Sequence, residues 1–284
     1  MDILYHYCST ASFHAIIQSR ALWLSSLSLS NDTMEGKLVA RAIARLAERD
    51  SLKPKSFHLL QRITGLLELV FDGLGFCLSE DDDLLSQWRG YAADATGVSI
   101  GFSKEYLKRL AKGNGCLLGR VEYDLSAHEA GVKPTYRELT QRIKDGTLKP
   151  DRGLGILQTA GMTDQQKAAT AMANLGKELL KLGPKLLPLF YQLYLMKSRA
   201  FREEKEWRVL TMLATDGKDE DPPSHRVVSN RIVPYLTVKL VEQSPIVEVI
   251  LGPKHDTPPK VVENFLKLND YGLVKVRPSE ASYR

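Results

Sequence analysis

The stretch FCLSEDDDLLSQWRGYAADATGVSIGF, from Phe76 to Phe102, predicts a strand, a helix and a second strand. Short apolar runs at 75–78 and 98–102 are typical of strands in a sheet. Between them, apolar and aromatic residues recur at helical spacing. These residues are Leu84, Leu85, Trp88 and Tyr91. We expect the rest of the chain to be organised around this unit.

Three acids, Asp81 to Asp83, stand where this helix would begin. Carboxylates at a helix start accept hydrogen bonds from free N–H groups and complement the helix dipole, so we expect them to act as caps. Polar or amphipathic residues gather around the same strand end and helix: Ser79, Glu80, Gln87, Trp88, Arg89 and Tyr91. They suggest a binding site. The alternative is that Trp88 and Tyr91 are packing residues.

The composition is that of an ordinary globular chain, with 43% hydrophobic and 26% charged residues, and it excludes disordered and fibrous classes. The 39 basic and 34 acidic residues leave a charge of +5. Because the basic residues are spread along the chain, this charge permits nucleic-acid contact without arguing for it. Three widely spaced cysteines are expected to be reduced thiols. With no signal peptide and no apolar run of about 18 residues, we expect a cytoplasmic protein and no membrane partner.

Strand and helix patterns alternate irregularly along the chain, which predicts an α+β fold. Strands are expected at 3–7, 21–24, 75–78, 98–102, 117–123, 207–213, 235–240, 246–251 and 273–276. Period two places Tyr5 and Tyr7 on one face of the first strand and Leu4 and His6 on the other. Helical patterns include 54–70, 259–268 and most of 136–194. We therefore expect a single domain over 1–284, with a mixed, strongly bent sheet flanked by helices and a helical insertion at about 125–200.

Several common catalytic motifs are excluded by their context. The sequence at 97–101 matches G-x-S-x-G, but its serine lies inside the apolar run with no strand before it, so a serine hydrolase is not expected. The glycines at 113, 115 and 119 lead from a helix into a strand, the reverse of a dinucleotide fingerprint. Walker, HExxH and CxxC sequences are absent, and the six histidines are scattered, so a protein-held zinc is not expected.

Acidic and basic residues cluster at the start of a late strand, in SRAFREEKEWRVL from Ser198. Period two sends Glu204, Glu206 and Arg208 to one face of that strand. Two carboxylates and a guanidinium can form a polar pocket in which Arg208 keeps a carboxylate ionised. The alternative is a solvent-facing edge strand with cross-strand ion pairs.

The chain resembles a broad, mostly bacterial family known only as domain-of-unknown-function family 2971. Matching pieces span nearly the whole chain in the family's order, with Thr33 where the family usually has proline. They are LYHY at 4–7, SNDTMEG at 30–36, FCLSE at 76–80, QWRGYA at 87–92, GVSIGF at 97–102, KSRAFREEKEWRVL from Lys197 and VEVILGP at 247–253.

The layout is also similar to the ADP-ribosyltransferase fold, whose enzymes bind NAD in a cleft of a split sheet without a Rossmann fingerprint. This resemblance gives the first-strand role to His6 or Tyr7 and the serine role to Ser79. It gives Glu206 the carboxylate role, with Glu204 completing a Glu-x-Glu pair. Such a carboxylate faces a cationic, oxocarbenium-like sugar as the glycosidic bond breaks.

The resulting hypothesis is an NAD-using ADP-ribosyltransferase-like enzyme, a toxin or defence effector that modifies a nucleic acid or a protein. Tyr7, Ser79, Trp88 and Glu206 are expected to line one cleft. Further NAD-binding candidates are Tyr91, Arg208 and, in the loop after the second strand, Asn31 and Asp32. One alternative is a non-catalytic nucleotide or nucleic-acid binding module. Another is a metal-dependent nuclease that uses Asp32, Glu35, Glu80, Glu204 and Glu206.

Overall fold

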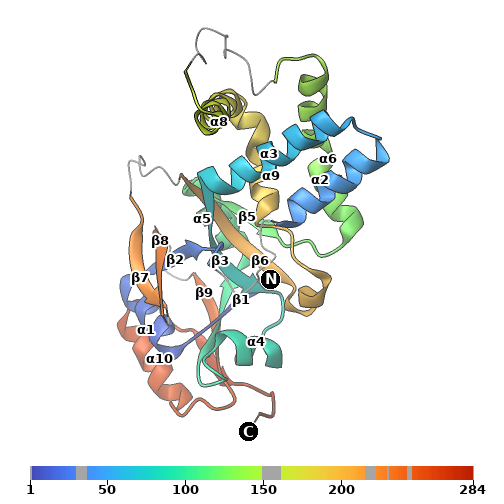
Figure 1. Ribbon diagram of the computed structural model, residues 1–284. Coiled ribbons are helices and arrows are strands. Elements are labelled where there is room, and N and C mark those ends of the chain that lie inside the picture. Colours follow the sequence, from blue (N-terminus) through green and yellow to red (C-terminus); the bar gives the residue numbers. More distant parts are fainter. Residues whose placement is uncertain are drawn as a thin grey trace.

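The computed structural model describes residues 2–29, 37–148, 161–214, 222–228, 230–241 and 245–283, and it shows one mixed sheet flanked by helices (Figure 1). The strands are β1 (Ile3–Cys8), β2 (Ala21–Ser26), β3 (Phe71–Ser79), β4 (Val98–Ser103), β5 (Leu117–Arg120), β6 (Glu206–Ala214), β7 (Ser224–Val228), β8 (Arg231–Lys239), β9 (Ile246–Leu251) and β10 (Lys275–Pro278). The α+β class predicted from the sequence is confirmed.

The helices carry most of the predicted apolar patterns. They are α1 (Thr10–Ser19), α2 (Lys37–Arg49), α3 (Pro54–Val70), α4 (Leu85–Tyr91), α5 (Lys104–Gly113), α6 (Leu125–Lys144), α8 (Asp164–Lys181), α9 (Gly183–Leu193), the 3₁₀ helix η1 (Arg199–Glu204) and α10 (Pro259–Leu268). The predicted bounds of α3 and α10 are confirmed. No helix in the described part of the chain combines the length and apolar character needed to cross a bilayer.

The sheet runs β10-β9-β4-β1-β3-β2-β8-β7, and β6 pairs with both β3 and β5. Strands β9 and β10 are parallel, and the other pairings are antiparallel. Strand β3 is longer than predicted, because glycines at 73 and 75 and the polar Asp72 hide its first half from an apolar pattern. Its pairing with β6 covers all nine of its residues.

The sheet forks along one edge of β3. There Ser79, at the end of β3, pairs with Tyr5 of β1. Earlier in β3, Gly75 pairs with Ser25 of β2, and the adjacent Leu74 pairs with Ser26. Cys77 lies between these two pairings, and its carbonyl accepts a hydrogen bond from the imidazole Nδ1 of His6 at 2.8 Å. A side chain thus satisfies a backbone carbonyl at the point where the two strands diverge.

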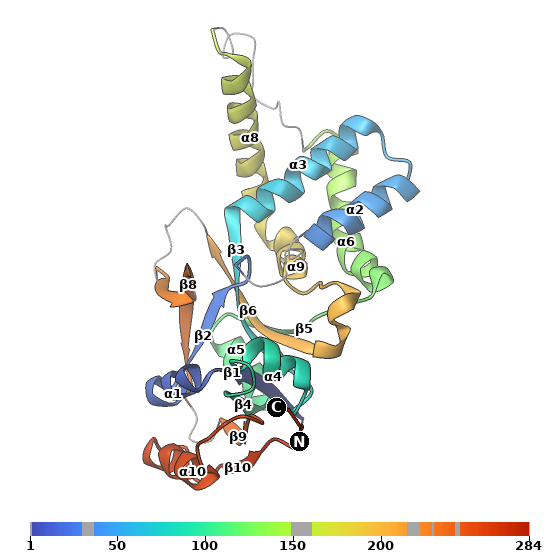
Figure 2. The ribbon, with the colours of Figure 1, turned by 60° about the horizontal axis from the view of Figure 1, so that its bottom comes forward.

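One side of the sheet is covered by α1, α5 and α10, which bury a large apolar core against β1, β3, β4 and β6. The other side is covered in two parts. Helix α4 packs over Tyr5 and Tyr7 of β1, and a helical layer packs over Leu210 of β6. Figure 2 shows α4 and this helical layer as separate groups of helices.

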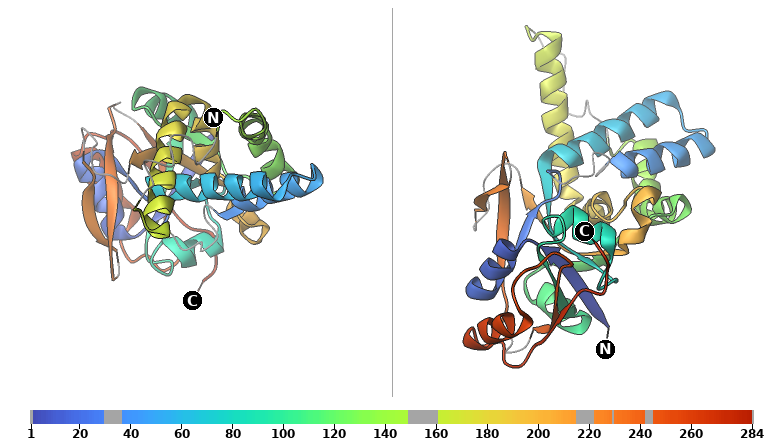
Figure 3. Two further views of the ribbon diagram at one scale, coloured as in Figure 1. Left: turned by 45° about the horizontal axis from the view of Figure 1, so that its top comes forward. Right: turned by 90° about the horizontal axis from the view of Figure 1, so that it is seen from below.

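The helical layer is built from two parts of the chain. Helices α6 and α9, within the predicted insertion at 125–200, share an apolar core with α2 and α3, which precede the sheet strand β3. Figure 3 shows these helices together, away from α1 and α10. The helical segment is therefore not a free-standing insertion but half of a layer, because its apolar face is buried by α2 and α3.

Candidate functional site

The junction of η1 and β6 points two acids into the protein. Ser198 caps η1 by accepting from the backbone N–H of Ala200, and the helix ends at Lys205, whose φ is 42°. Glu204 and Glu206, on either side of this left-handed residue, are only 7% and 5% exposed. Glu206 and Arg208 point to one side of β6, as period two predicts. The side chain of Glu204 also lies beside that of Glu206, but Glu204 is the last residue of η1 and not part of the strand.

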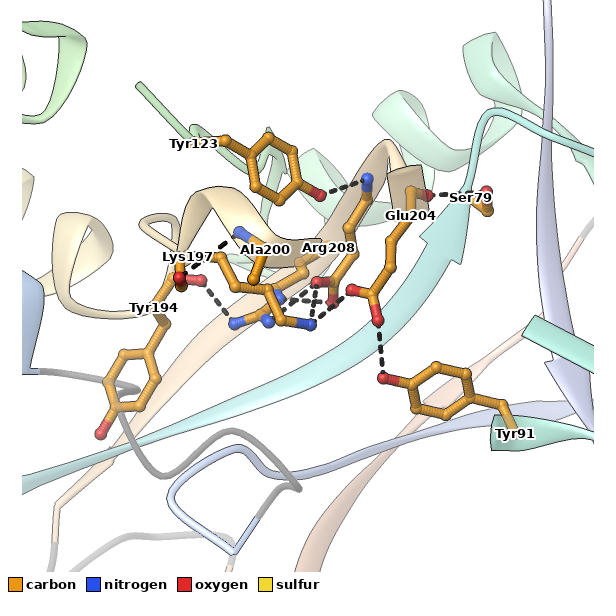
Figure 4. Close-up of polar contacts among 10 residues, drawn as sticks. Ser79, Tyr91, Tyr123, Tyr194, Lys197, Ala200, Glu204 and Arg208 are labelled. Carbon is orange, nitrogen blue, oxygen red and sulfur yellow. Dashed lines mark hydrogen bonds and ion pairs between the residues drawn. The ribbon is translucent and has the colours of Figure 1, made fainter. Parts of the chain in front are cut away.

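Lys197 joins the two carboxylates. Its ammonium nitrogen lies 2.5 Å from Oε2 of Glu204 and 3.1 Å from Oε2 of Glu206, and all three side chains are buried (Figure 4). Because removing charges from water is costly, such groups are stable only when each is paired and hydrogen-bonded.

Arg208 supplies the second cation. Its Nε and Nη2 donate to the two carboxylate oxygens of Glu206 at 2.7 and 3.0 Å, and its Nη1 donates to the carbonyl of Tyr194 at 2.7 Å. A two-point contact of this kind fixes the orientation of a carboxylate. We call Lys197, Glu204, Glu206 and Arg208 the ion cluster; its formal charges sum to zero.

Three hydroxyl groups surround the ion cluster. Tyr91 donates to Oε1 of Glu204 at 3.0 Å, although its side chain is attached to α4 on another part of the fold. Ser79 donates to the carbonyl of Glu204 at 2.8 Å. The hydroxyl of Tyr123 accepts from the backbone N–H of Glu206 at 2.9 Å. Figure 4 shows Tyr91 and Tyr123 on opposite sides of Glu204.

The charges in the cluster shift one another's titration. Burial by itself would raise the pKa of Glu206, but Arg208 and Lys197 outweigh it and lower that pKa to about 2. Burial would lower the pKa of Lys197, and the two carboxylates raise it above its usual value instead. Burial raises the pKa of the Tyr91 phenol. Tyr91 is therefore a neutral hydrogen-bond donor, and Glu206 is an anion.

Tyr7 lies on the same side of the sheet as Glu206, and it is covered by Trp88, a residue of α4. The Tyr7 hydroxyl donates to the carbonyl of Asp81 and accepts from the N–H of Leu84, each at 2.9 Å. Trp88 is fully buried, and its ring meets that of Tyr7 edge-on. The predicted set of Tyr7, Ser79, Trp88 and Glu206 thus shares one side of the sheet. Its members are buried and make their contacts within the protein rather than being exposed along a cleft.

His6 points away from this side. Its ring stacks on Phe76 at 4.0 Å, within the core on the opposite side of the sheet. Burial lowers the pKa of His6 to about 4. Since strand neighbours alternate, His6 and Tyr7 do not serve the same site, and of these two only Tyr7 is on the side of the sheet that carries the ion cluster.

The prediction that the acids at 81–83 cap α4 is wrong. The N-cap is Leu84, and the three carboxylates bind elsewhere. Asp83 accepts from the indole of Trp88 and from Ser279, Asp82 pairs with Arg277, and Asp81 pairs with Lys205. Asp82 and Asp83 attach the loop before α4 to the C-terminal part of the chain, and Asp81 attaches it to the residue between η1 and β6.

Two predicted NAD-binding residues, Asn31 and Asp32, and one predicted nuclease acid, Glu35, lie outside the described residues. Of the other nuclease acids, Glu80 lies 3.3 Å from Arg120 and accepts from the indole of Trp207. Among the described residues no group of three or more His, Cys, Asp or Glu side chains is placed to hold a metal ion.

A polar groove opens beside the ion cluster, with a volume of about 560 Å³. Its lining residues are Glu80, Arg120, Val121, Glu122, Tyr123, Asp124, Arg202, Glu203 and Lys205. Tyr123 belongs both to this groove and to the contacts of Glu206. The groove therefore reaches the backbone of the site from the side opposite Tyr91.

Lys197 and Tyr123 are not among the site residues predicted from the sequence. Lys197 is seven residues before Glu204, and neither a helix nor a strand would bring the two side chains into contact, since two helical turns alone separate them by roughly 10 Å. The contact arises because the chain turns through η1, while the backbone N–H of Lys197 bonds to the carbonyl of Glu122. Nothing in the local pattern signals that turn.

Part of the chain matches a known protein family. Residues 87–209 match the family described as Protein of unknown function (DUF2971). The matched stretch runs from α4 to β6 and contains Tyr91 and the whole ion cluster, whereas Tyr7 and Ser79 precede it. It supports the family resemblance seen in the sequence. No curated protein and no solved structure matches the chain.

Proposed function

We propose that this DUF2971-like chain is an ADP-ribosyltransferase-like enzyme that uses NAD as a substrate, with Glu204 as its reactive carboxylate. The observation that carries the proposal is the environment of Glu204. Lys197 holds one of its oxygens, and Tyr91, a residue 41% exposed, holds the other. A ligand at the Tyr91 side therefore meets a buried anion that is already oriented.

The assignment differs from the one implied by the sequence, where Glu206 had this role. Both oxygens of Glu206 are bound by Arg208, and Lys197 adds a third contact. Glu206 is therefore better suited to position Lys197 than to face a substrate. Tyr7 and Ser79 support the site by holding the loop at 81–84 and the backbone of Glu204.

The proposed chemistry is transfer of an ADP-ribosyl group to a nucleic acid or protein. The bond between the ribose carbon and the nicotinamide nitrogen breaks, and its electron pair leaves with nicotinamide. A nucleophile of the acceptor forms a bond to the same carbon and releases its proton to solvent. Glu204 stabilises the positive charge on the sugar, and a preorganised charge of this kind in a dry site lowers the barrier by several kcal/mol.

The forked sheet and the lack of a Rossmann fingerprint also support an ADP-ribosyltransferase-like enzyme.

One observation favours a second candidate, a nucleotide-binding module without turnover. The ion cluster is neutral and internally paired, as expected of a purely structural network. The two candidates differ in whether nicotinamide is released.

The test measures nicotinamide release and NAD affinity with protein and RNA acceptors. Glu204→Gln should lower turnover by about a hundredfold or more while leaving the Kd for NAD nearly unchanged, because the charge acts mainly in the transition state. The matched control is Glu48→Gln, since Glu48 is an exposed residue of α2 outside the site. NAD binding without release in the wild type would favour the binding module. If NAD does not bind, the proposal is wrong.

A further inference from the structure

The polar groove has the dimensions of a ligand site. Its volume of about 560 Å³ falls in the range of about 300–1,000 Å³ seen for ligand pockets. Unlike most such pockets it is lined largely by charged side chains, and Val121 is its one aliphatic residue. An apolar ligand would find little dry surface there, so the occupant must be polar.

The charges of the groove have both signs. Its acids are Glu80, Glu122, Asp124 and Glu203, and its bases are Arg120, Arg202 and Lys205. Some are already paired, because Glu80 lies beside Arg120 and Lys205 lies 2.9 Å from Asp81. Arg202 and Glu203 are exposed, and their side chains make no ion pair within the described part of the chain. The groove therefore presents an unpaired cation and an unpaired anion side by side.

We infer that this groove binds a polypeptide segment that carries both an acidic and a basic side chain. The acid of such a segment pairs with Arg202 and its base with Glu203. A nucleic acid fits less well, since its phosphates would face four carboxylates and like charges disfavour association. This inference stands whether or not the chain uses NAD.

The groove is connected to the ion cluster through backbone contacts. Tyr123 forms part of the groove, and its hydroxyl accepts a hydrogen bond from the backbone N–H of Glu206. Lys205 lies between the two buried acids, and its carbonyl accepts from the N–H of Glu80 at 3.2 Å. A bound segment therefore contacts the residues that hold Glu204 and Glu206 in place.

The test uses capped five-residue peptides followed by amide chemical shifts of the full chain. The probe is acetyl-Ala-Lys-Ala-Glu-Ala-amide, and the comparisons carry two lysines, two glutamates or alanine alone. We expect saturable shifts of the Tyr123 and Glu206 amides with the mixed-charge peptide, and weaker binding of the others. Arg202→Glu and Glu203→Lys should each weaken binding about fivefold or more, as expected from converting one exposed ion pair into a repulsion.

The control variant is Lys267→Glu, on the exposed side of α10, which changes the net charge as Arg202→Glu does. It should leave peptide affinity within twofold of the wild type. A parallel titration uses a single-stranded oligonucleotide of ten thymidines. Tighter binding of that probe, lost in Arg202→Glu, would assign the groove to nucleic acid and overturn the inference. Absence of saturable shifts at the groove with every peptide would also overturn it.

Discussion

The ammonium of Lys197 lies 2.5 Å from a carboxylate oxygen of Glu204, and both side chains are buried. Lys197 is shared, since Glu206 also accepts from it. The two acids are nevertheless unequal, because Glu206 makes two bonds to Arg208 whereas Glu204 binds the partly exposed Tyr91. On this basis we expect Glu206 to matter for stability, and we propose Glu204 for the chemistry.

Glu206→Gln should destabilise the fold strongly. The change leaves the fully buried Arg208 without its carboxylate, and breaking a buried ion pair typically costs about 3–5 kcal/mol. Urea unfolding followed by circular dichroism measures the change. Glu203→Gln, at the exposed neighbouring position, should alter stability by about 0.5 kcal/mol or less. A loss below about 1 kcal/mol for Glu206→Gln would show that Arg208 finds other compensation.

Stability should depend on the protonation of His6 between pH 6.5 and 4. Burial lowers its pKa to about 4 in the folded chain, against 6.5 when exposed. The unfolded state therefore binds more protons in this window, so His6 contributes stability above pH 6.5 that is lost as the pH falls to 4. The loss amounts to about 3 kcal/mol for a shift of this size.

His6→Gln keeps a donor for the Cys77 carbonyl and removes the titrating group. The stability of this variant should change less than that of the wild type between pH 6.5 and 4, as measured by urea unfolding at each pH. NMR titration of the His6 ring gives the pKa directly. A midpoint near 6.5 would contradict the prediction.

Much of the fold could be predicted because local pattern and burial agree. The alternation of Tyr5 and Tyr7 against Leu4 and His6 reports the two faces of β1 directly. The sequence-based prediction fails where the local pattern and the burial of the residues disagree. Strand β7, Ser224–Val228, cannot be predicted from the sequence, because its residues are mostly exposed and show no apolar alternation.

The candidate site was predicted only in part, for a different physical reason. Period two correctly placed Glu206 and Arg208 together. The contacts of Lys197 and Tyr91 with Glu204 depend on a turn at Lys205 and on the packing of α4, both of which are tertiary. A sequence pattern reports which face a side chain takes, but not which distant group meets it there.

Gly97 and Gly90 flank the end of α4 and should respond in opposite ways to alanine. A Cβ at Gly97 would lie 2.1 Å from the carbonyl oxygen of Cys8, a backbone atom in β1, so Gly97→Ala should cost about 3 kcal/mol or more. At Gly90, in the helix, the Cβ meets nothing within 4 Å. Gly90→Ala should stabilise by up to about 1 kcal/mol through helix propensity. Thermal unfolding of both variants tests the pair, and similar effects of the two substitutions would contradict it.

The C-terminal residues 279–283 hold both ends of α4. Before the helix, Asp83 accepts from the hydroxyl of Ser279 and from the N–H of Glu280. After it, Asp94 accepts from the hydroxyl of Tyr283 at 2.7 Å. Asp94 is the middle one of three consecutive left-handed residues, with φ of 50°, 54° and 69° at 93–95. Left-handed conformations cost about 1–2 kcal/mol per residue, so this turn needs the outside support that Tyr283 gives it.

Tyr283→Ala should therefore loosen α4, which carries Tyr91 to Glu204. We expect the amides at 85–95 to exchange about tenfold faster with solvent, which corresponds to losing the hydroxyl contact with Asp94 and the ring contact with Lys254. Tyr283→Phe keeps the ring and loses only the hydroxyl, so its exchange rates should fall between those of the wild type and the alanine variant. Exchange in α5, on the other side of the sheet, serves as the internal control. Unchanged exchange at 85–95 in Tyr283→Ala would mean that packing of Trp88 is sufficient to hold α4 without the C-terminal residues.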